Sequence, residues 1–215
     1  MILRGERGFT MLELLVTLIV MSIGMLGMAS LQLNSMKASR QALYRSVAVN
    51  FAQDMANRIE SVPSEMIPAT LSNSGFHMSC WTNETGCLTG YNTANCTTTT
   101  GCTANQMAKD LIDEWASNLS GSSGLPSGAG RVCIDSEQST SCDAAVNAAA
   151  GDVIYYTIWV SWHEPNPPSY CDPNGDGVTD YHTADDASTT SDDRACFKMV
   201  LPVKANWNTW GYMAR

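Results

Sequence analysis

The sequence predicts an α+β fold in which one long N-terminal helix packs on an antiparallel sheet with disulfide-stapled loops. Three features of the 215-residue chain predict it. An apolar N-terminal run passes directly into a helical pattern, three β-rich segments follow in the C-terminal half, and all eight cysteines lie within residues 80–196. Helices followed by strands, rather than alternating with them, are typical of α+β domains with an antiparallel sheet.

The first element is an apolar run that is long enough to cross a membrane. Between Phe9 and Met36 the only charged residue is Glu13, and about 20–25 apolar residues span a bilayer core. We therefore assign residues 9–33 to a transmembrane helix. A secretory signal peptide would have a shorter apolar region and a small-residue cleavage site. A plain signal anchor leaves Glu13 unexplained, since a carboxylate in an apolar span costs a few kcal/mol.

The helix is expected to continue as an amphipathic segment over residues 34–62. Apolar residues recur mostly every four positions, which is the pattern of one helix face, and Pro63 is expected to end the helix. We expect this face to pack on the sheet; its residues are Met36, Leu43, Val47, Phe51, Met55, Ile59 and Val62.

Residues 63–215 form the predicted head domain. Residues 63–104 are rich in Ser, Thr, Asn and Gly and predict a long loop. A short helix is predicted over residues 105–119, with Gly121 as its stop signal and Met107, Leu111, Ile112, Trp115 and Leu119 on one face. Residues 131–135, 153–162 and 195–204 are predicted strands. Pro202 places the end of the last strand at an edge or a bulge.

The charge is distributed unevenly along the chain. From Pro63 onward there are 6 Lys and Arg against 17 Asp and Glu, a net charge of −11 with His neutral. An acidic head disfavours nucleic-acid binding, which requires a basic face, and it favours solubility of an exposed domain. The arginines Arg4 and Arg7 ahead of the apolar run predict a cytoplasmic N-terminus.

No catalytic pattern is present in the sequence. His77, His163 and His182 lie far apart, and neither a metalloprotease motif nor a phosphate-binding glycine loop occurs. We therefore expect that the protein is not an enzyme.

The cysteines predict disulfides rather than a metal site. No two cysteines are spaced C-x-x-C, the spacing that zinc ribbons and thioredoxin-like sites usually have. An even number confined to the head fits an oxidising compartment. Sequence alone leaves the connectivity open; proximity favours the pairs Cys80–Cys87, Cys96–Cys102, Cys133–Cys142 and Cys171–Cys196.

One acidic loop resembles the loop of a calcium-binding EF-hand. Side-chain oxygens fall at positions 1, 3, 5 and 9 and a glycine, Gly177, at position 6. The candidate ligands are Asp172, Asn174, Asp176, the carbonyl of Val178 and Asp180. Position 12 is Thr183 rather than glutamate, although Asp185 or Asp186 could take its place. The alternative is an acidic, turn-rich surface loop, and we expect no other cofactor.

The segment Gly8-Phe9-Thr10-Met11-Leu12-Glu13 resembles the class III signal of type IV prepilins and type II secretion pseudopilins. The resemblance implies that residues 1–8 are a leader, that a prepilin peptidase cuts after Gly8, and that Phe9 is then N-methylated. It also implies that Glu13 pairs with the terminal amine of a neighbouring subunit. Pairing would offset the cost of burying the carboxylate and would fix the register of assembly.

The remaining motifs resemble the PilV group of minor pilins, the type IV pilus modification proteins. They are the Gly-Met-Leu-Gly-Met stretch of the first helix, Asp-Glu-Trp in the short helix and Trp-Val-Ser-Trp in a strand. The resemblance implies a type IV pilin fold and a role in initiating pilus assembly within a tip-located priming complex. Implied partners are other minor pilins, the major pilin, a tip adhesin, the prepilin peptidase and the inner-membrane assembly platform.

The same resemblance implies where the protein resides. Before assembly it would be a single-pass inner-membrane protein with a periplasmic head; afterwards it would be part of an extracellular pilus. The alternatives are a type II secretion pseudopilin and a tip module that binds a ligand or surface.

Overall fold

The computed structural model describes residues 10–66, 74–78, 80–91, 96, 101–121, 124–135, 153–164 and 194–204. The elements occur in the order α1 (Met11–Ser61), α2 (Pro63–Met66), α3 (Ala104–Ser120), β1 (Ala129–Asp135), β2 (Val153–His163) and β3 (Arg194–Lys204). The chain divides into two compact units, Met1–Leu43 and Tyr44–Arg215, and we describe each by itself.

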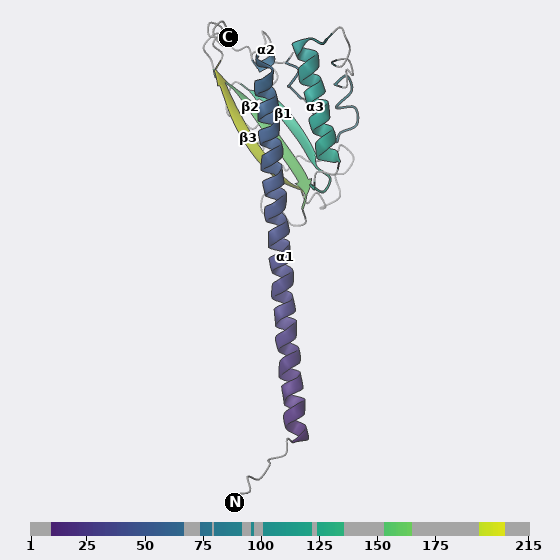
Figure 1. Ribbon diagram of the computed structural model, residues 1–215, viewed down its shortest axis with the longest axis vertical. Helices are drawn as coiled ribbons and strands as arrows, with labels where there is room; N and C mark the ends of the chain where they lie inside the picture. The colour runs from purple at the N-terminus through teal and green to yellow at the C-terminus, as the bar shows by residue number, and fades with distance from the viewer. Residues whose placement is uncertain are drawn as a thin grey trace, which may run out of the picture. The chain divides into compact units, whose positions relative to one another are not determined.

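The head contains a three-stranded antiparallel sheet in the order β1-β2-β3 (Figure 1). Ile158 in the central strand faces Val132 on one side and Met199 on the other. Pro202 lies opposite Tyr155 near the end of β3, which has β2 as its only strand partner among the described residues. All three predicted strands are confirmed, and Pro202 occupies an outer strand as its missing N–H requires.

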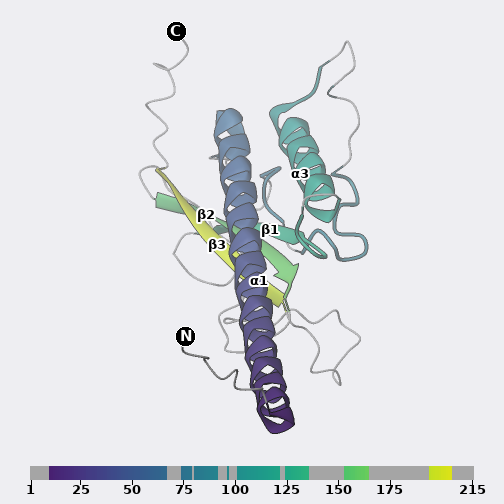
Figure 2. The ribbon, with the colours of Figure 1, turned by 60° about the horizontal axis from the view of Figure 1, so that its bottom comes forward.

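One face of the sheet meets the helices. Alternate residues of a strand share a face, and the central strand contributes Ile154, Tyr156, Ile158, Val160 and Trp162 to the main core. The head part of α1 crosses this face, and α3 runs beside it (Figures 1 and 2). The predicted α+β architecture is confirmed. A smaller cluster on the other face contains Trp81, Ala129, Cys133 and Trp159.

The prediction for the apolar face of α1 was partly wrong. Met55, Ile59 and Val62 are buried as expected, and α1 ends at Ser61, just before Pro63. Met36 and Leu43, however, are 57% and 59% exposed. They precede the part of α1 that contributes to the core, whose first buried residues are instead Ala48 and Ala52. Because alanine has a short side chain, it lets the helix backbone approach its neighbours closely. A pattern that counts only large apolar residues does not reveal such a buried face.

Helix α3 begins and ends where its capping residues dictate. The Thr103 side chain accepts a hydrogen bond from the Gln106 backbone, and the Gln106 side chain accepts one from the Thr103 N–H, a complete capping box. At the other end the Gly121 N–H donates to the Ser117 carbonyl. Ile112, Trp115 and Leu119 are buried as predicted.

The predicted apolar face of α3 needs one correction. Met107 is 43% exposed, and Leu111 is only half-buried. The buried face instead includes Ala108 and Ala116. Each lies about 100° around the helix from the residue before it, Met107 and Trp115 respectively.

Trp115 joins three elements of the head. Its side chain is fully buried, and its indole Nε1 donates to the Phe51 carbonyl of α1 at 3.0 Å. Its ring lies over Gly130 of β1 so closely that a Cβ at that position would overlap it.

A second contact between α1 and α3 is made by Arg58. Its guanidinium binds Asp54 at 2.8 Å, Glu114 at 3.1 Å and the Leu111 carbonyl at 3.2 Å. Burial alone would lower the Arg58 pKa, but these acidic partners raise it.

Two of the predicted disulfides are confirmed. Cys80 is bonded to Cys87, and Cys96 is bonded to Cys102. Cys133 and Cys196 are also disulfide-bonded, but Cys142 and Cys171 lie outside the described residues, so these two pairings stay predictions.

The segment carrying the first disulfide lies along the free edge of β1. The Met78 N–H donates to the Val132 carbonyl at 2.8 Å, and the Thr82 N–H donates to the Gly130 carbonyl at 3.0 Å. The edge carbonyls of β1 are therefore satisfied, which protects that edge from pairing with another chain.

We predict that Gly130→Ala destabilises the head by about 1–3 kcal/mol, because the added methyl group would overlap the Trp115 ring and overpack the core. Urea unfolding of the detergent-solubilised chain, followed by tryptophan fluorescence, measures the effect. The combination with Trp115→Phe provides the control. Since the smaller ring relieves the overlap, the double variant should lose less stability than the sum of the two single variants; strict additivity would contradict the packing described.

A second prediction concerns His77, whose Nδ1 is buried and has no hydrogen-bond partner among the residues that the structure describes. Burial, and then the nearby Arg131 cation, lower the His77 pKa below its usual 6.5. The unfolded chain thus binds the proton more readily, and stability falls as the pH drops below about 6.5. Between pH 7 and pH 5 the parent should lose more stability than His77→Gln. Parallel unfolding curves at both pH values test this; an equal loss in parent and variant would rule it out.

Candidate functional site

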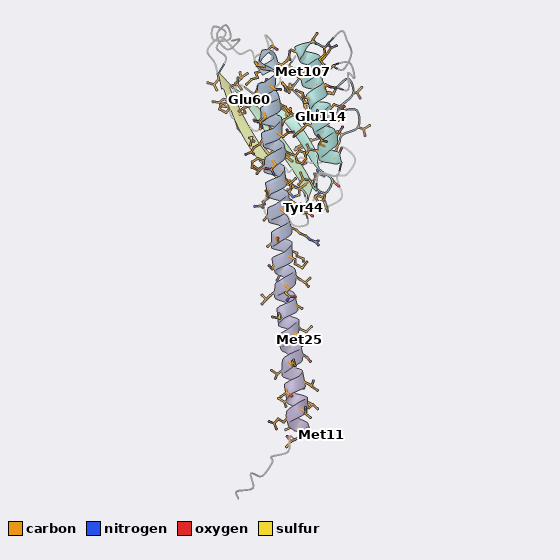
Figure 3. All side chains as sticks on the ribbon, viewed as in Figure 1. Met11, Met25, Tyr44, Glu60, Met107 and Glu114 are labelled. Atoms are coloured by element: carbon orange, nitrogen blue, oxygen red, sulfur yellow. A yellow bond between two sulfur atoms is a disulfide. The ribbon has the colours of Figure 1, made fainter. Side chains whose placement is uncertain are left out.

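The candidate site is the N-terminal stretch of α1, whose side chains are exposed all around the helix. Every residue from Thr10 to Arg40 is exposed, including large apolar residues such as Leu18 and Leu26. In Figure 3 the side chains around Met11 and Met25 stand out from the helix on all sides. A helix that is apolar all around is typical of a membrane span or of the interior of an assembly.

This stretch meets the length requirement for a membrane helix. Among the described residues, α1 is the one helix long and apolar enough to cross a bilayer, judged by length and composition. Two of its hydroxyls are satisfied within the helix: Thr17 Oγ1 donates to the Leu14 carbonyl and Ser22 Oγ to the Leu18 carbonyl. These hydroxyls therefore add little to the cost of an apolar environment.

Glu13 lies in the first turn of α1. Its backbone N–H donates to Thr10, to the carbonyl at 3.0 Å and to Oγ1 at 3.3 Å. Thr10 and Glu13 thus have the spacing of a capping box, and the structure shows its threonine half. The helix dipole favours a negative charge at this end. The carboxylate is exposed and able to receive a cationic partner from another chain.

Sequence reasoning predicted a pairing role for Glu13 but missed the part played by Thr10. The signal that could have revealed it is the T-x-x-E spacing at the start of the apolar run.

Two glycines interrupt the apolar stretch without breaking the helix. Helix α1 is continuous through Gly24 and Gly27, and a Cβ built at either position would meet no atom within 4 Å. Nothing in the described part of the chain therefore requires glycine at these two positions. Small residues in membrane helices often mark close contacts with neighbouring helices.

Several predicted site residues lie outside the described part of the chain. They are Gly8 and Phe9 at the expected cleavage point, and the candidate calcium ligands Asp172, Asn174, Asp176, Val178 and Asp180. Cleavage, methylation and calcium binding at these positions stay predictions. Within the described residues no group of three metal-ligating side chains comes together.

Comparison with known families agrees with this geometry. Residues 30–112 match the family model described as type IV pilin Tt1218, and residues 3–29 match the prokaryotic N-terminal methylation motif. The chain is thus similar to type IV pilins over residues 3–112, and its fold is that of a type IV pilin. The two matches adjoin, so that they cover the whole of α1 and continue into α3. No curated protein and no solved structure matches the pilin significantly.

The pilin class explains why so much apolar surface is exposed. A pilin is held in the membrane by its N-terminal helix and is then assembled into a pilus. In both settings apolar groups surround the helix, so side chains that are exposed in a single chain would be covered there. The methylation motif also implies processing by a prepilin peptidase. The assignment to the PilV group goes further than these matches and stays a prediction.

We predict that Glu13→Gln or Glu13→Ala lowers incorporation of the pilin into filaments, because either change removes the charge that would pair with a neighbouring terminal amine. The amount of pilin in sheared filaments, divided by the amount in membranes, measures incorporation. Glu13→Asp keeps the charge on a shorter side chain and should retain more incorporation than Gln. Equal incorporation of all three variants and the parent would contradict a pairing role.

Proposed function

We propose that this pilin is a minor subunit that helps to initiate type IV pilus assembly, within a priming complex that ends at the filament tip. It acts as a structural subunit and not as an enzyme. The observation that carries the proposal is the exposed, uniformly apolar stretch of α1 with one acid in its first turn. Such a helix is suited to pack among other helices of the same kind, with Glu13 as its only internal charge.

The charge of the head favours a subunit present in few copies over the major subunit of the filament. Its sequence carries a net charge of −11 from Pro63 onward. If thousands of such heads were stacked side by side, like charges would accumulate along the filament and oppose assembly. A subunit present once or a few times avoids that repulsion. The connections between strands are also long, with 17 residues between β1 and β2 and 30 between β2 and β3; a tip leaves room for them.

The proposed partners follow from the same reasoning. Other minor pilins, the major pilin and a tip adhesin would contact the pilin in the filament, while the inner-membrane assembly platform would receive it from the membrane. Before assembly the pilin would cross the inner membrane once, with its head in the periplasm. There the cysteines could form disulfides, as those of the described residues do.

Deletion of the gene tests the proposal. We expect few or no surface pili, restored by the parent gene, while the major pilin still accumulates in membranes. In filaments sheared from the parent, mass spectrometry should find the pilin at far lower abundance than the major subunit. Finding the pilin as the main component, or undiminished piliation in the deletion strain, would overturn the proposal.

The same strain separates the two alternatives. Normal pili with impaired attachment would instead indicate a tip module that binds a surface. Normal pili with impaired export of secreted proteins would indicate a type II secretion pseudopilin.

A further inference from the structure

Lys37 and Arg40 mark the point at which the apolar stretch of α1 ends. They are the first basic residues of the helix and lie one turn apart, both exposed. No ion pair involves either of them among the described residues. The nearest acids along α1 are Glu13 on one side and Asp54 on the other. The pair therefore presents two positive charges that no group in this part of the chain neutralises.

The position of the pair along the helix matches one level of a membrane. Lys37 follows Glu13 by 24 residues, which is about 36 Å at 1.5 Å per residue. A bilayer has a hydrocarbon core of about 30 Å, and about 40–45 Å including the headgroups. When Glu13 lies at the cytoplasmic boundary of the core, Lys37 therefore lies among the headgroups of the opposite face. Arg40 lies about 4.5 Å further along the axis.

The side chains can reach headgroup phosphates from there. Helical side chains lean toward the N-terminus, so Lys37 lies over Leu33 and Arg40 over Met36, both largely exposed apolar residues. The aliphatic stems can cover these residues while the charged ends stay in the polar layer. The planar guanidinium of Arg40 suits a phosphate, which it can bind through two parallel hydrogen bonds.

We propose that Lys37 and Arg40 bind the phosphate groups of anionic phospholipids at the outer face of the membrane in which the pilin resides before assembly. Carboxylates of a neighbouring acidic head carry the same charge, but nothing holds them at this level of the helix, whereas the end of the apolar stretch places headgroups there. The inference rests on the membrane stage of the proposed function. Its consequence is that these contacts must break when the subunit leaves the bilayer.

The test uses the full-length pilin in vesicles of phosphatidylcholine and phosphatidylglycerol. Electron spin resonance of spin-labelled lipids measures how strongly each lipid associates with the protein. We expect the parent to favour phosphatidylglycerol at least about fivefold, since one basic residue near an anionic surface is worth roughly that factor and the helix presents two. The double variant Lys37→Gln/Arg40→Gln should reduce the preference at least about threefold, and Lys37→Arg should retain it.

Arg45 provides a control of matched charge on the same helix. It is exposed and lies about 12 Å beyond Lys37 and about 7.5 Å beyond Arg40 along the helix axis, so salt screens it more strongly from the phosphates than it screens that pair. Arg45→Gln should therefore lower the lipid preference much less than Lys37→Gln or Arg40→Gln. A drop of equal size with Arg45→Gln would overturn the proposal in favour of diffuse charge attraction.

Other outcomes are equally decisive. An unchanged preference in the double variant overturns the proposal. So does a preference lost in inorganic phosphate but not in chloride of the same ionic strength, because that result indicates a site for free phosphate. If no lipid is immobilised by the parent, the helix is not in the bilayer and the membrane stage of the proposed function fails too. Loss of selectivity alone leaves that function intact.

Discussion

The head depends on one buried tryptophan. Trp115 donates to the Phe51 carbonyl of α1, fills the space above Gly130 of β1, and belongs to α3. Each of these contacts requires the other two, because the ring can reach α1 only if β1 has no side chain in the way. Trp115 thus connects both helices to the sheet within the head, and the contact of Arg58 with Glu114 is a second connection between the two helices.

Small residues around Trp115 have the same effect elsewhere in the head. Ala48 and Ala52 on α1 and Ala108 on α3 are completely buried, and Gly75 lies where a Cβ would overlap the Asn105 carbonyl and Ala108. Close packing without voids requires small groups opposite large ones. The large groups here are aromatic: Trp115, Trp162, Tyr156 and Phe76. Polar ends of these rings are satisfied as well, since the Tyr156 hydroxyl lies 3.0 Å from the carbonyls of Glu65 and Met66.

The sequence predicts the elements better than it predicts their packing. The strand centred on Ile158 is dense in β-branched and aromatic residues, and α3 is bounded by capping signals at Thr103 and Gly121, so both could be located without a structure. Which face of α1 is buried was partly missed, because burial of Ala48 depends on what lies opposite, and that information is in other segments. The two confirmed disulfides join cysteines only a few residues apart, where pairing by proximity is most informative.

In the candidate site too, the sequence identifies some residues by themselves but not those whose role depends on their position in space. Glu13 stands out from sequence because one carboxylate interrupts a long apolar run, and its pairing with another chain stays a prediction. Lys37 and Arg40 do not stand out from sequence, because their meaning comes from their distance to Glu13 along a continuous helix.

Because a helix rises by a constant length per residue, the number of residues between two positions gives their separation along the helix axis. About 36 Å separate the one acid of the apolar stretch from its first basic residue, so the two charges lie at opposite boundaries of a bilayer core. In the proposed membrane stage both charges could therefore stay in contact with polar groups. If the helix is then drawn out of lipid into a filament, the basic pair would lose the headgroups and Glu13 would lose its contact with water. The acid would then require a cation from a neighbour, because an unpaired buried charge is costly, and on this proposal the cost of the unpaired charge favours assembly.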